Sequence, residues 1–187
     1  SNVYSTIAFI WVLLDLDVKI YVEDMTYGNY SAISFDLPED VDESKISLAI
    51  NDKKYDFNRT MALSKLAIGD YLVNLTYAGD SKYASASFTE SFKVDKASPN
   101  LAIDVDDEYF SNPVKITVST DSDAGGNVSI RIGDIAKTAA ISNGKAEFII
   151  DDLQAGTYEI QAAYYGNENY SSMNLTSTFK VKKYNST

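Results

Sequence analysis

The sequence predicts an all-β protein made of two tandem β-sandwiches, and three observations carry that prediction. Apolar and polar residues alternate along most of the chain, which is typical of strands that bury one face. The same pattern, with many of the same residues, occurs twice. No segment shows the spacing of an amphipathic helix.

The repeat is clearest toward the end of each copy. Residues 66–94 match residues 153–181 without a gap, and eleven of the 29 positions are identical. A second pair of segments, 20–35 and 103–118, matches at a separation of 83 residues instead of 87, so the second copy carries four more residues between its matched blocks. We therefore expect two homologous modules of about 80 to 85 residues.

The boundary between the modules is predicted at a short linker around Lys96–Pro99, because proline fixes the backbone and cannot join a central strand. The predicted domains are residues 17–96 and residues 97–187. Residues 1–16 are predicted to be either the leftover strand of a preceding repeat or an extended N-terminal strand.

The strands of the second module can be followed in order by their alternating apolar residues. The expected runs are 103–105, 114–118, 128–132, 146–150, 158–164 and 175–181. Turn signals separate these runs at Gly125-Gly126, Gly133-Asp134 and Asn143-Gly144, of which the last is a strong hairpin signal. Six or seven short strands in about 85 residues are typical of a β-sandwich.

One short motif indicates which kind of sandwich this is. The pattern Leu-x-x-Gly-x-Tyr occurs at Leu66–Tyr71 and again at Leu153–Tyr158. A glycine that opens a strand and an inward tyrosine two residues later are typical of the tyrosine corner of immunoglobulin-like (Ig-like) sandwiches. Because the chain has no cysteine, each module must depend on its apolar core without a disulfide.

The segment that follows the tyrosine corner also repeats, as YAGDSKY at Tyr77–Tyr83 and as YYGNENY at Tyr164–Tyr170. The first tyrosine of each copy continues the inward set and is predicted to lie in the core. The glycine and polar residues should connect the last two strands, and the second tyrosine should open the final strand. Any specificity is expected in the tip that differs between the copies.

These stretches, GDYLVNLTYAGDSKY…FKV and GTYEIQAAYYGNENY…FKV, resemble the end of Ig-like repeats in large bacterial and archaeal surface proteins. The adhesin-like proteins of methanogenic archaea are the most similar, and the resemblance covers about residues 18–183. It implies an extracellular, non-enzymatic repeat array at the cell surface, which extends a stalk and presents surface for contact. The implied partners are neighbouring repeats and a host or microbial surface protein or glycan.

Composition excludes several other classes of protein. Histidine and cysteine are absent, which removes Ser-His-Asp and Cys-His catalysis and the usual zinc and haem ligands. A net charge of −11 with only two arginines argues against nucleic-acid binding. We expect no enzymatic activity and no cofactor. The apolar run Ile7–Leu14 is shorter than the roughly 20 residues that cross a bilayer, so no membrane insertion is expected.

Asn-x-Ser/Thr sequons are enriched and predict a glycoprotein that follows a secretory route. The seven acceptor residues are Asn29, Asn58, Asn74, Asn127, Asn169, Asn174 and Asn185. The alternative is that the polar faces of strands favour asparagine and threonine two residues apart.

Acidic clusters at residues 39–43, 104–108 and 121–123 raise the question of calcium. The segment Asp121–Asn127 resembles the opening of a calcium loop, but Gly125 stands at the fifth position and Ile132 at the twelfth. We therefore expect solvated acidic loops and no metal site.

Exposed aromatic side chains support an alternative function, a carbohydrate- or protein-binding module. Tyr165 follows inward Tyr164 and should point outward, while Tyr30 and Tyr109 lie near the turns after the first strands. These three tyrosines, together with the loop tips, form the predicted ligand surface, and ordinary edge packing is the alternative.

The apolar N-terminal run, residues 3–14, is rich in β-prone residues. Shifted by 83 residues, Phe9 falls on Phe92 and Trp11 falls on Val94, as in a last strand that has lost its own sheet. An exposed strand of this kind pairs readily with other edges. We expect it to dock on the first module or to mediate self-association, and a flexible tail is the alternative.

Overall fold

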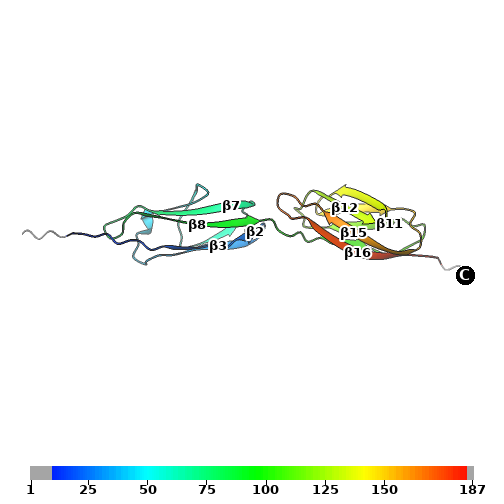
Figure 1. The fold of residues 1–187 in the computed structure, drawn as a ribbon, viewed down its shortest axis with the longest axis horizontal. Helices are drawn as coiled ribbons and strands as arrows, with labels where there is room; N and C mark the ends of the chain where they lie inside the picture. The colour runs from blue at the N-terminus through cyan, green and yellow to red at the C-terminus, as the bar shows by residue number, and fades with distance from the viewer. Residues whose placement is uncertain (1–9, 185–187) are drawn as a thin grey trace, which may run out of the picture. The chain divides into compact units, whose positions relative to one another are not determined.

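The structure, a computed structural model, describes residues 10–184. These residues form two compact units that divide between Val94 and Asp95, called unit 1 and unit 2 below (Figure 1). Apart from one 3-10 turn, η1 (Glu43–Lys45), every regular element in residues 10–184 is a β-strand. In this part of the chain no helix is long and apolar enough to cross a membrane.

Unit 1 consists of a three-stranded and a five-stranded sheet. The three-stranded sheet has the order β1 (Lys19–Tyr21), β3 (Tyr30–Asp36), β6 (Thr60–Ser64). The five-stranded sheet has the order β2 (Met25–Thr26), β8 (Ala86–Asp95), β7 (Gly69–Tyr77), β4 (Ile46–Ile50), β5 (Lys53–Tyr55). The leading segment of the unit therefore contributes one strand to each sheet.

Unit 2 repeats this topology strand by strand. Its three-stranded sheet has the order β9 (Ala102–Val105), β11 (Val114–Ser119), β14 (Lys145–Ile150). Its five-stranded sheet has the order β10 (Glu108–Tyr109), β16 (Met173–Lys182), β15 (Gly156–Tyr164), β12 (Asn127–Ile132), β13 (Ile135–Ala140). The two units are tandem Ig-like β-sandwiches, as the sequence predicts.

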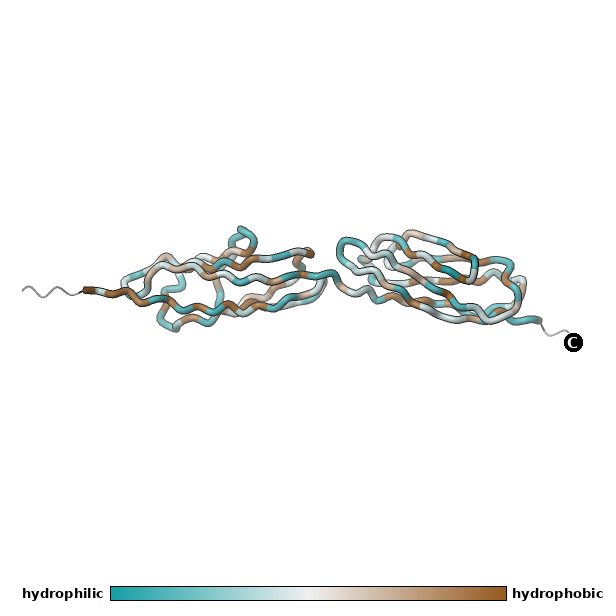
Figure 2. The backbone as a smooth tube through the Cα atoms, in the orientation of Figure 1, coloured by the Kyte–Doolittle hydropathy of each residue, from teal (hydrophilic) through white to brown (hydrophobic). Residues whose placement is uncertain are grey.

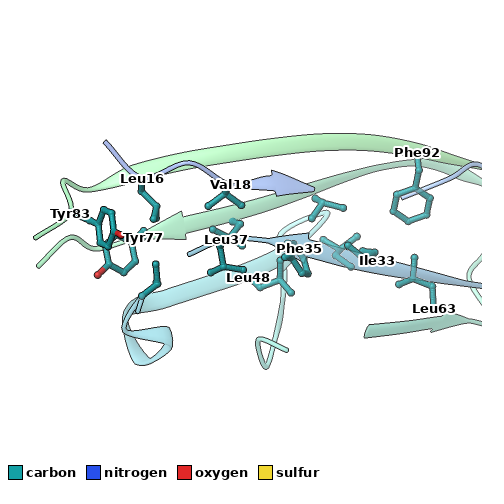
Figure 3. Close-up of a cluster of buried hydrophobic side chains, with 14 of the residues drawn as sticks. Leu16, Val18, Ile33, Phe35, Leu37, Leu48, Leu63, Tyr77, Tyr83 and Phe92 are labelled. Atoms are coloured by element: carbon teal, nitrogen blue, oxygen red, sulfur yellow. The ribbon is translucent and has the colours of Figure 1, made fainter. Parts of the chain in front are cut away.

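The cores lie between the paired sheets and consist of the alternating residues of each strand, as the colours along the tube in Figure 2 illustrate. In unit 1, Ile33, Val73 and Leu75 have no exposed surface, and Figure 3 shows how the two sheets face one another across such side chains. Ile116, Val128 and Ile160 are equally buried in unit 2. Burial of each such side chain stabilises the folded unit by about 1.5–3 kcal/mol, so the core holds the sandwich together without a disulfide.

The tyrosine corner is present in both units. The hydroxyl of Tyr71 donates to the carbonyl of Ala67 at 2.8 Å, and that of Tyr158 donates to the carbonyl of Gln154 at 2.7 Å. Gly69 and Gly156 are the first residues of β7 and β15. The prediction from the Leu-x-x-Gly-x-Tyr motif is therefore confirmed at the level of the hydrogen bond.

The Asn143-Gly144 prediction is confirmed only locally. Both residues have positive φ, at 48° and 72°, and Ser142 and Lys145 exchange both backbone hydrogen bonds across the turn. The flanking strands do not form a hairpin, however, because β13 pairs with β12 whereas β14 pairs with β11. The turn carries the chain from one sheet to the other.

The additional residues of the second copy lie in and after β13. In unit 2, β12 and β13 pair over six positions, from Asn127↔Ala140 to Ile132↔Ile135. In unit 1, β4 and β5 pair over only three, from Leu48↔Tyr55 to Ile50↔Lys53. After β5 the chain of unit 1 returns at once to the three-stranded sheet.

Two side chains secure this shorter return in unit 1. Phe57 packs on Phe35, with ring centroids 5.3 Å apart. The half-buried guanidinium of Arg59 donates to the carbonyls of Leu37 and Pro38 at 2.9 and 3.1 Å, and to a Glu43 carboxylate oxygen at 2.7 Å. One arginine therefore joins the start of β6 to the loop before η1.

Candidate functional site

The repeated tyrosine-glycine segments form the connections between the last two strands of each unit. We call residues 78–85 of unit 1 and residues 165–172 of unit 2 the closing loops. Gly79 and Gly166 have φ of 86° and 77°. A Cβ at Gly79 would lie 2.9 Å from the backbone nitrogen of Ser85, and one at Gly166 would lie 2.8 Å from the carbonyl oxygen of Tyr170. Both the dihedral angle and the close approach require glycine.

One polar side chain organises each closing loop. In unit 1, an Asp80 carboxylate oxygen accepts hydrogen bonds from the backbone N–H groups of Lys82 and Tyr83, both at 2.7 Å. In unit 2, the Asn167 side-chain oxygen accepts the equivalent bonds from Asn169 and Tyr170 at 2.9 and 2.8 Å. Aspartate and asparagine are interchangeable here because both offer the same oxygen to the backbone.

The paired tyrosines are structural. Tyr77 and Tyr164 are 2% and 1% exposed, as predicted for core residues. The hydroxyl of Tyr77 donates to the second carboxylate oxygen of Asp80 at 2.7 Å, whereas that of Tyr164 donates to the carbonyl of Gly125 at 2.8 Å. Tyr77 therefore connects the closing loop of unit 1 to the body of its sandwich, whereas Tyr164 bonds the segment that precedes β12 in unit 2.

The prediction that Tyr83 and Tyr170 open the final strands is wrong. β8 and β16 begin three residues later, at Ala86 and Met173. The two tyrosines lie in the closing loops instead, where the hydroxyl of Tyr83 donates to Asp40 at 2.9 Å and that of Tyr170 donates to Asp123 at 2.7 Å.

In each unit, the closing loop also holds the segment that enters the sandwich. Leu14 pairs in parallel with Tyr83, and Ala97 pairs in parallel with Tyr170. The bonds are the same in both units. The N–H of Leu14 donates to Lys82 and its carbonyl accepts from Ala84, at 2.8 and 2.9 Å. The N–H of Ala97 donates to Asn169 and its carbonyl accepts from Ser171, at 3.0 and 2.9 Å. Backbone bonds of this kind leave no side-chain signal in the sequence.

The charges around the closing loop differ between the units. In unit 1, hydrogen bonds from Tyr83, Tyr77 and Lys82 lower the pKa of Asp80 to about 2. Burial, together with the bond to Asp80, raises the pKa of Tyr77 to about 12. The hydrogen bond from Lys82, with a second from Tyr83, lowers the pKa of Asp40. Unit 2 has the uncharged Asn167 in place of Asp80, so this part of its loop cannot titrate.

The predicted acceptor asparagines are distributed over both units. Five of them have exposed side chains: Asn29, Asn58, Asn74, Asn127 and Asn174. Asn169 is half-buried in the closing loop of unit 2, and Asn185 lies outside the described residues. Glycosylation itself remains a prediction.

The three tyrosines of the predicted ligand surface are divided between the units, and the two in unit 2 lie at opposite ends of β15. Tyr30 is 77% exposed at the start of β3 in unit 1. In unit 2, Tyr109 stacks on Tyr184 with ring centroids 4.9 Å apart, beside the last residues of β16. Tyr165 follows the other end of β15 and is 59% exposed. Tyr109 and Tyr165 are therefore separate surface features of unit 2, and Tyr30 belongs to the surface of unit 1.

The acidic clusters take part in structural hydrogen bonds. The carboxylate of Asp121 accepts from the backbone and side-chain N–H groups of Asn100 at 2.8 and 2.6 Å. Asp107 accepts from the N–H of Lys180 at 2.8 Å, and this bond, with the ammonium of Lys182, lowers the pKa of Asp107. Among residues 10–184, no three acidic side chains are grouped as a metal site would require.

The N-terminal run reaches unit 1 at Leu14. Its preceding described residues, Ile10, Trp11 and Val12, are 87%, 86% and 80% exposed. Residues 3–9 of the predicted self-association segment lie outside the described residues, so that prediction stays open.

Comparison with known proteins agrees with this architecture. The family model for the bacterial Ig-like domain (group 3) matches residues 107–182, which make up most of unit 2. No curated protein matches the chain.

Several solved tandem structures are similar along most of the chain. The fibronectin(III)-like modules of Clostridium thermocellum CbhA share 16% identity, covering 89% of this chain and 95% of theirs, with a TM-score of 0.37. A tandem of titin Ig domains shares 10% identity over 90% of this chain and 97% of its own, with a TM-score of 0.36. At these values, the assignment of the fold rests on the strand order described above.

Proposed function

We propose that this chain is part of a non-enzymatic, adhesin-like stalk at the cell surface, of the kind found in methanogenic archaea. Each unit acts as a spacer that extends the array and presents surface for contact. The match of unit 2 to the bacterial Ig-like domain supports an interaction or stalk module. The exposed acceptor asparagines support an extracellular location.

One observation carries the proposal. In unit 2 the chain enters beside Tyr170, at Ala97, and leaves after Lys182, at the far end of β16. In unit 1 it enters beside Tyr83, at Leu14, and leaves at the far end of β8. A ten-residue strand spans about 33 Å, so entry and exit lie at opposite ends of each sandwich. A module threaded in this way adds its full length to an array.

Strand pairing joins the first segment of each unit to the closing loop at the entry end and to the last strand at the exit end, and side-chain hydrogen bonds add to it at the exit end. β10 pairs in parallel with β16, at Glu108↔Val181 and Tyr109↔Lys182. Asp24 accepts from the N–H of Lys93 at 2.7 Å in unit 1, as Asp107 does from Lys180 in unit 2. A pull on the two ends of a unit would therefore load several hydrogen bonds together.

A distance measurement tests the stalk. The chain contains no cysteine, so Asp15→Cys and Lys183→Cys place two spin labels and no others. We expect a distance above about 60 Å between them, which is roughly twice the length of a ten-residue strand. A dominant population below about 40 Å, on the same scale, would mean that the units fold back on one another and would contradict the stalk.

A further inference from the structure

The outer face of the five-stranded sheet of unit 2 carries a cation without a partner. Arg131 of β12 is exposed, and its side chain makes no hydrogen bond or ion pair with any residue in 10–184. The other arginine, Arg59, has all three of its nitrogen groups engaged. In a chain of net charge −11, the guanidinium of Arg131 is therefore free to form a charge-assisted pair with an anionic ligand.

Arg131 stands between two adjoining hollows in this face. One has a volume of about 300 Å³ and is bordered by Ser129, Asn174 and Thr176 as well as by Arg131 and Gln161. The other has a volume of about 400 Å³ and shares Arg131 and Gln161 with the first. The pairings Arg131↔Gln161 and Gln161↔Thr176 place these side chains in one row across β12, β15 and β16. We call this row and its two hollows the Arg131 groove.

An aromatic ring borders the same face. The hydroxyl of Tyr165 hydrogen-bonds the hydroxyl oxygen of Ser129 at 2.9 Å, and the side chain remains 59% exposed. Ser129 is two residues from Arg131 on the same strand, so both point to the same side of the sheet. The ring is therefore held within about 7–14 Å of the guanidinium, one or two strand repeats away.

Unit 1 has the same sheet without these groups. Pairing places Ala49 opposite Asn74 where unit 2 has Arg131 opposite Gln161. The residue after β7 is Ala78, where unit 2 has Tyr165 after β15. The residues that build the fold are repeated, whereas the guanidinium and the exposed ring occur only in unit 2. The fold does not need them.

We propose that the Arg131 groove binds an oligosaccharide that carries a carboxylate. The guanidinium receives the carboxylate in a bidentate pair. The amides of Gln161 and Asn174 and the hydroxyl of Thr176 supply donors and acceptors for sugar hydroxyls. The ring of Tyr165 packs on the apolar face of a neighbouring sugar.

The negative charge of Glu159, next to the groove, provides a test in which a substitution should strengthen binding. Glu159 borders the second hollow, where its carboxylate accepts from the Gln161 amide at 3.0 Å. It repels an anionic ligand and has no such effect on a neutral one. Glu159→Gln should therefore tighten binding about twofold, as expected for removing one screened like charge at this range.

The binding experiment uses the full chain produced without glycosylation, because Asn174 is also a predicted acceptor. The probes are oligogalacturonates of defined length and the same oligomers with their carboxylates methyl-esterified, titrated while amide NMR signals are followed. We expect shifts in β12, β15 and β16 with the acid form and at least tenfold weaker binding of the ester. Arg131→Ala should weaken binding of the acid form at least tenfold, as for a lost charge-assisted pair.

Two control variants separate the groove from the rest of the surface. Tyr165→Ala should weaken binding severalfold, whereas Tyr30→Ala, which removes an even more exposed ring in unit 1, should leave it unchanged. A screen of other acidic sugars with their esters follows if galacturonate is too weak. Equal binding of acid and ester, or no binding across the screen, overturns the proposal. Arg131-dependent binding of an acidic peptide in place of any sugar also overturns it. None of these three results bears on the stalk, which the distance measurement tests separately.

Discussion

Units 1 and 2 share one frame but complete it by different means. Both have the tyrosine corner, the glycine of the closing loop and the same parallel pairing of the entering segment. Unit 2 ends its five-stranded sheet with β13, which pairs over six positions. Unit 1 ends its sheet with β5, which pairs over three, and secures the return of the chain with Arg59 and Phe57. The residues that the two units share are therefore those that bond the backbone or approach it closely. The edge of the sheet is free to vary.

The largest loss of stability is expected when the shared glycine of the closing loop is replaced by alanine. Gly166→Ala should destabilise unit 2 by roughly 3 kcal/mol, from the left-handed φ and from overlap with three backbone groups. Gly79→Ala should cost unit 1 roughly 2 kcal/mol, because its closest contacts involve fewer atoms. Denaturant unfolding followed by NMR signals of each unit checks both values. Equal, negligible losses would show that the loops adapt.

A second variant concerns what only unit 1 has. Arg59→Lys should destabilise unit 1 by about 1–2 kcal/mol and leave unit 2 unchanged, because lysine cannot reach two carbonyls and a carboxylate at once. The same unfolding experiment measures it. Arg131→Lys in unit 2 is the matched control and should be neutral, since Arg131 has no partner in residues 10–184.

Loss of the hydroxyl of Tyr77 or Tyr164, the buried last residues of β7 and β15, should change the stability of the two units by different, smaller amounts. Tyr164→Phe leaves the carbonyl of Gly125 without its bond and should cost about 1–1.5 kcal/mol. Tyr77→Phe should cost about 0.5 kcal/mol, because Asp80 keeps two backbone donors and gains access to water. Tyr71→Phe and Tyr158→Phe, the two corner tyrosines, should cost equal amounts and serve as the reference pair. A larger loss of stability from Tyr77→Phe than from Tyr164→Phe would contradict this account.

The smallest expected effect is a pH dependence of the closing loop that unit 1 shows and unit 2 does not. The pKa of Asp80 is about 2 in the folded loop against an ordinary 3.8, so the carboxylate stabilises the loop above pH 4. That contribution is lost as the pH falls from about 4 toward 2. The amide signal of Tyr83, which donates to Asp80, should therefore shift over this range. The amide signal of Tyr170 should show no such shift, because its acceptor, Asn167, has no carboxylate to protonate.

Exchanging the two side chains sharpens this test. Asp80→Asn should remove the low-pH shift from unit 1, and Asn167→Asp should introduce it in unit 2. If both loops respond to acid alike in the unaltered chain, then another group controls the response.

The sequence was sufficient for the strands and insufficient for their partners. Alternation identifies the buried set, because any strand with one covered face must alternate, and the tyrosine corner identifies one connection. Alternation does not say which strands pair, so Asn143-Gly144 suggested a hairpin where the chain changes sheets. Alternation also does not say where a strand begins, so it predicts Tyr83 and Tyr170 in the final strands although these strands begin three residues later.

The candidate site was accessible to sequence reasoning only in part. The exposed direction of Tyr165 follows from inward Tyr164, and the structure agrees. Its proximity to Ser129 and Arg131 depends on the register of β12 against β15, which no residue pattern encodes. The signal that was present is the difference between copies: arginine and tyrosine in one, alanine at both positions in the other.

The bond between the entering segment and the closing loop also has a consequence for the order of biosynthesis. Leu14 finds its partner in Tyr83, and Ala97 finds its partner in Tyr170, so each pairing joins residues made early and late in the same module. Such distant contacts form slowly and only after the intervening chain exists. A nascent module therefore stays open until its penultimate strand has emerged, and unit 1 can close before the last strands of unit 2 have been translated. Sequential closure keeps two modules of the same strand order and related sequence from pairing with each other's strands.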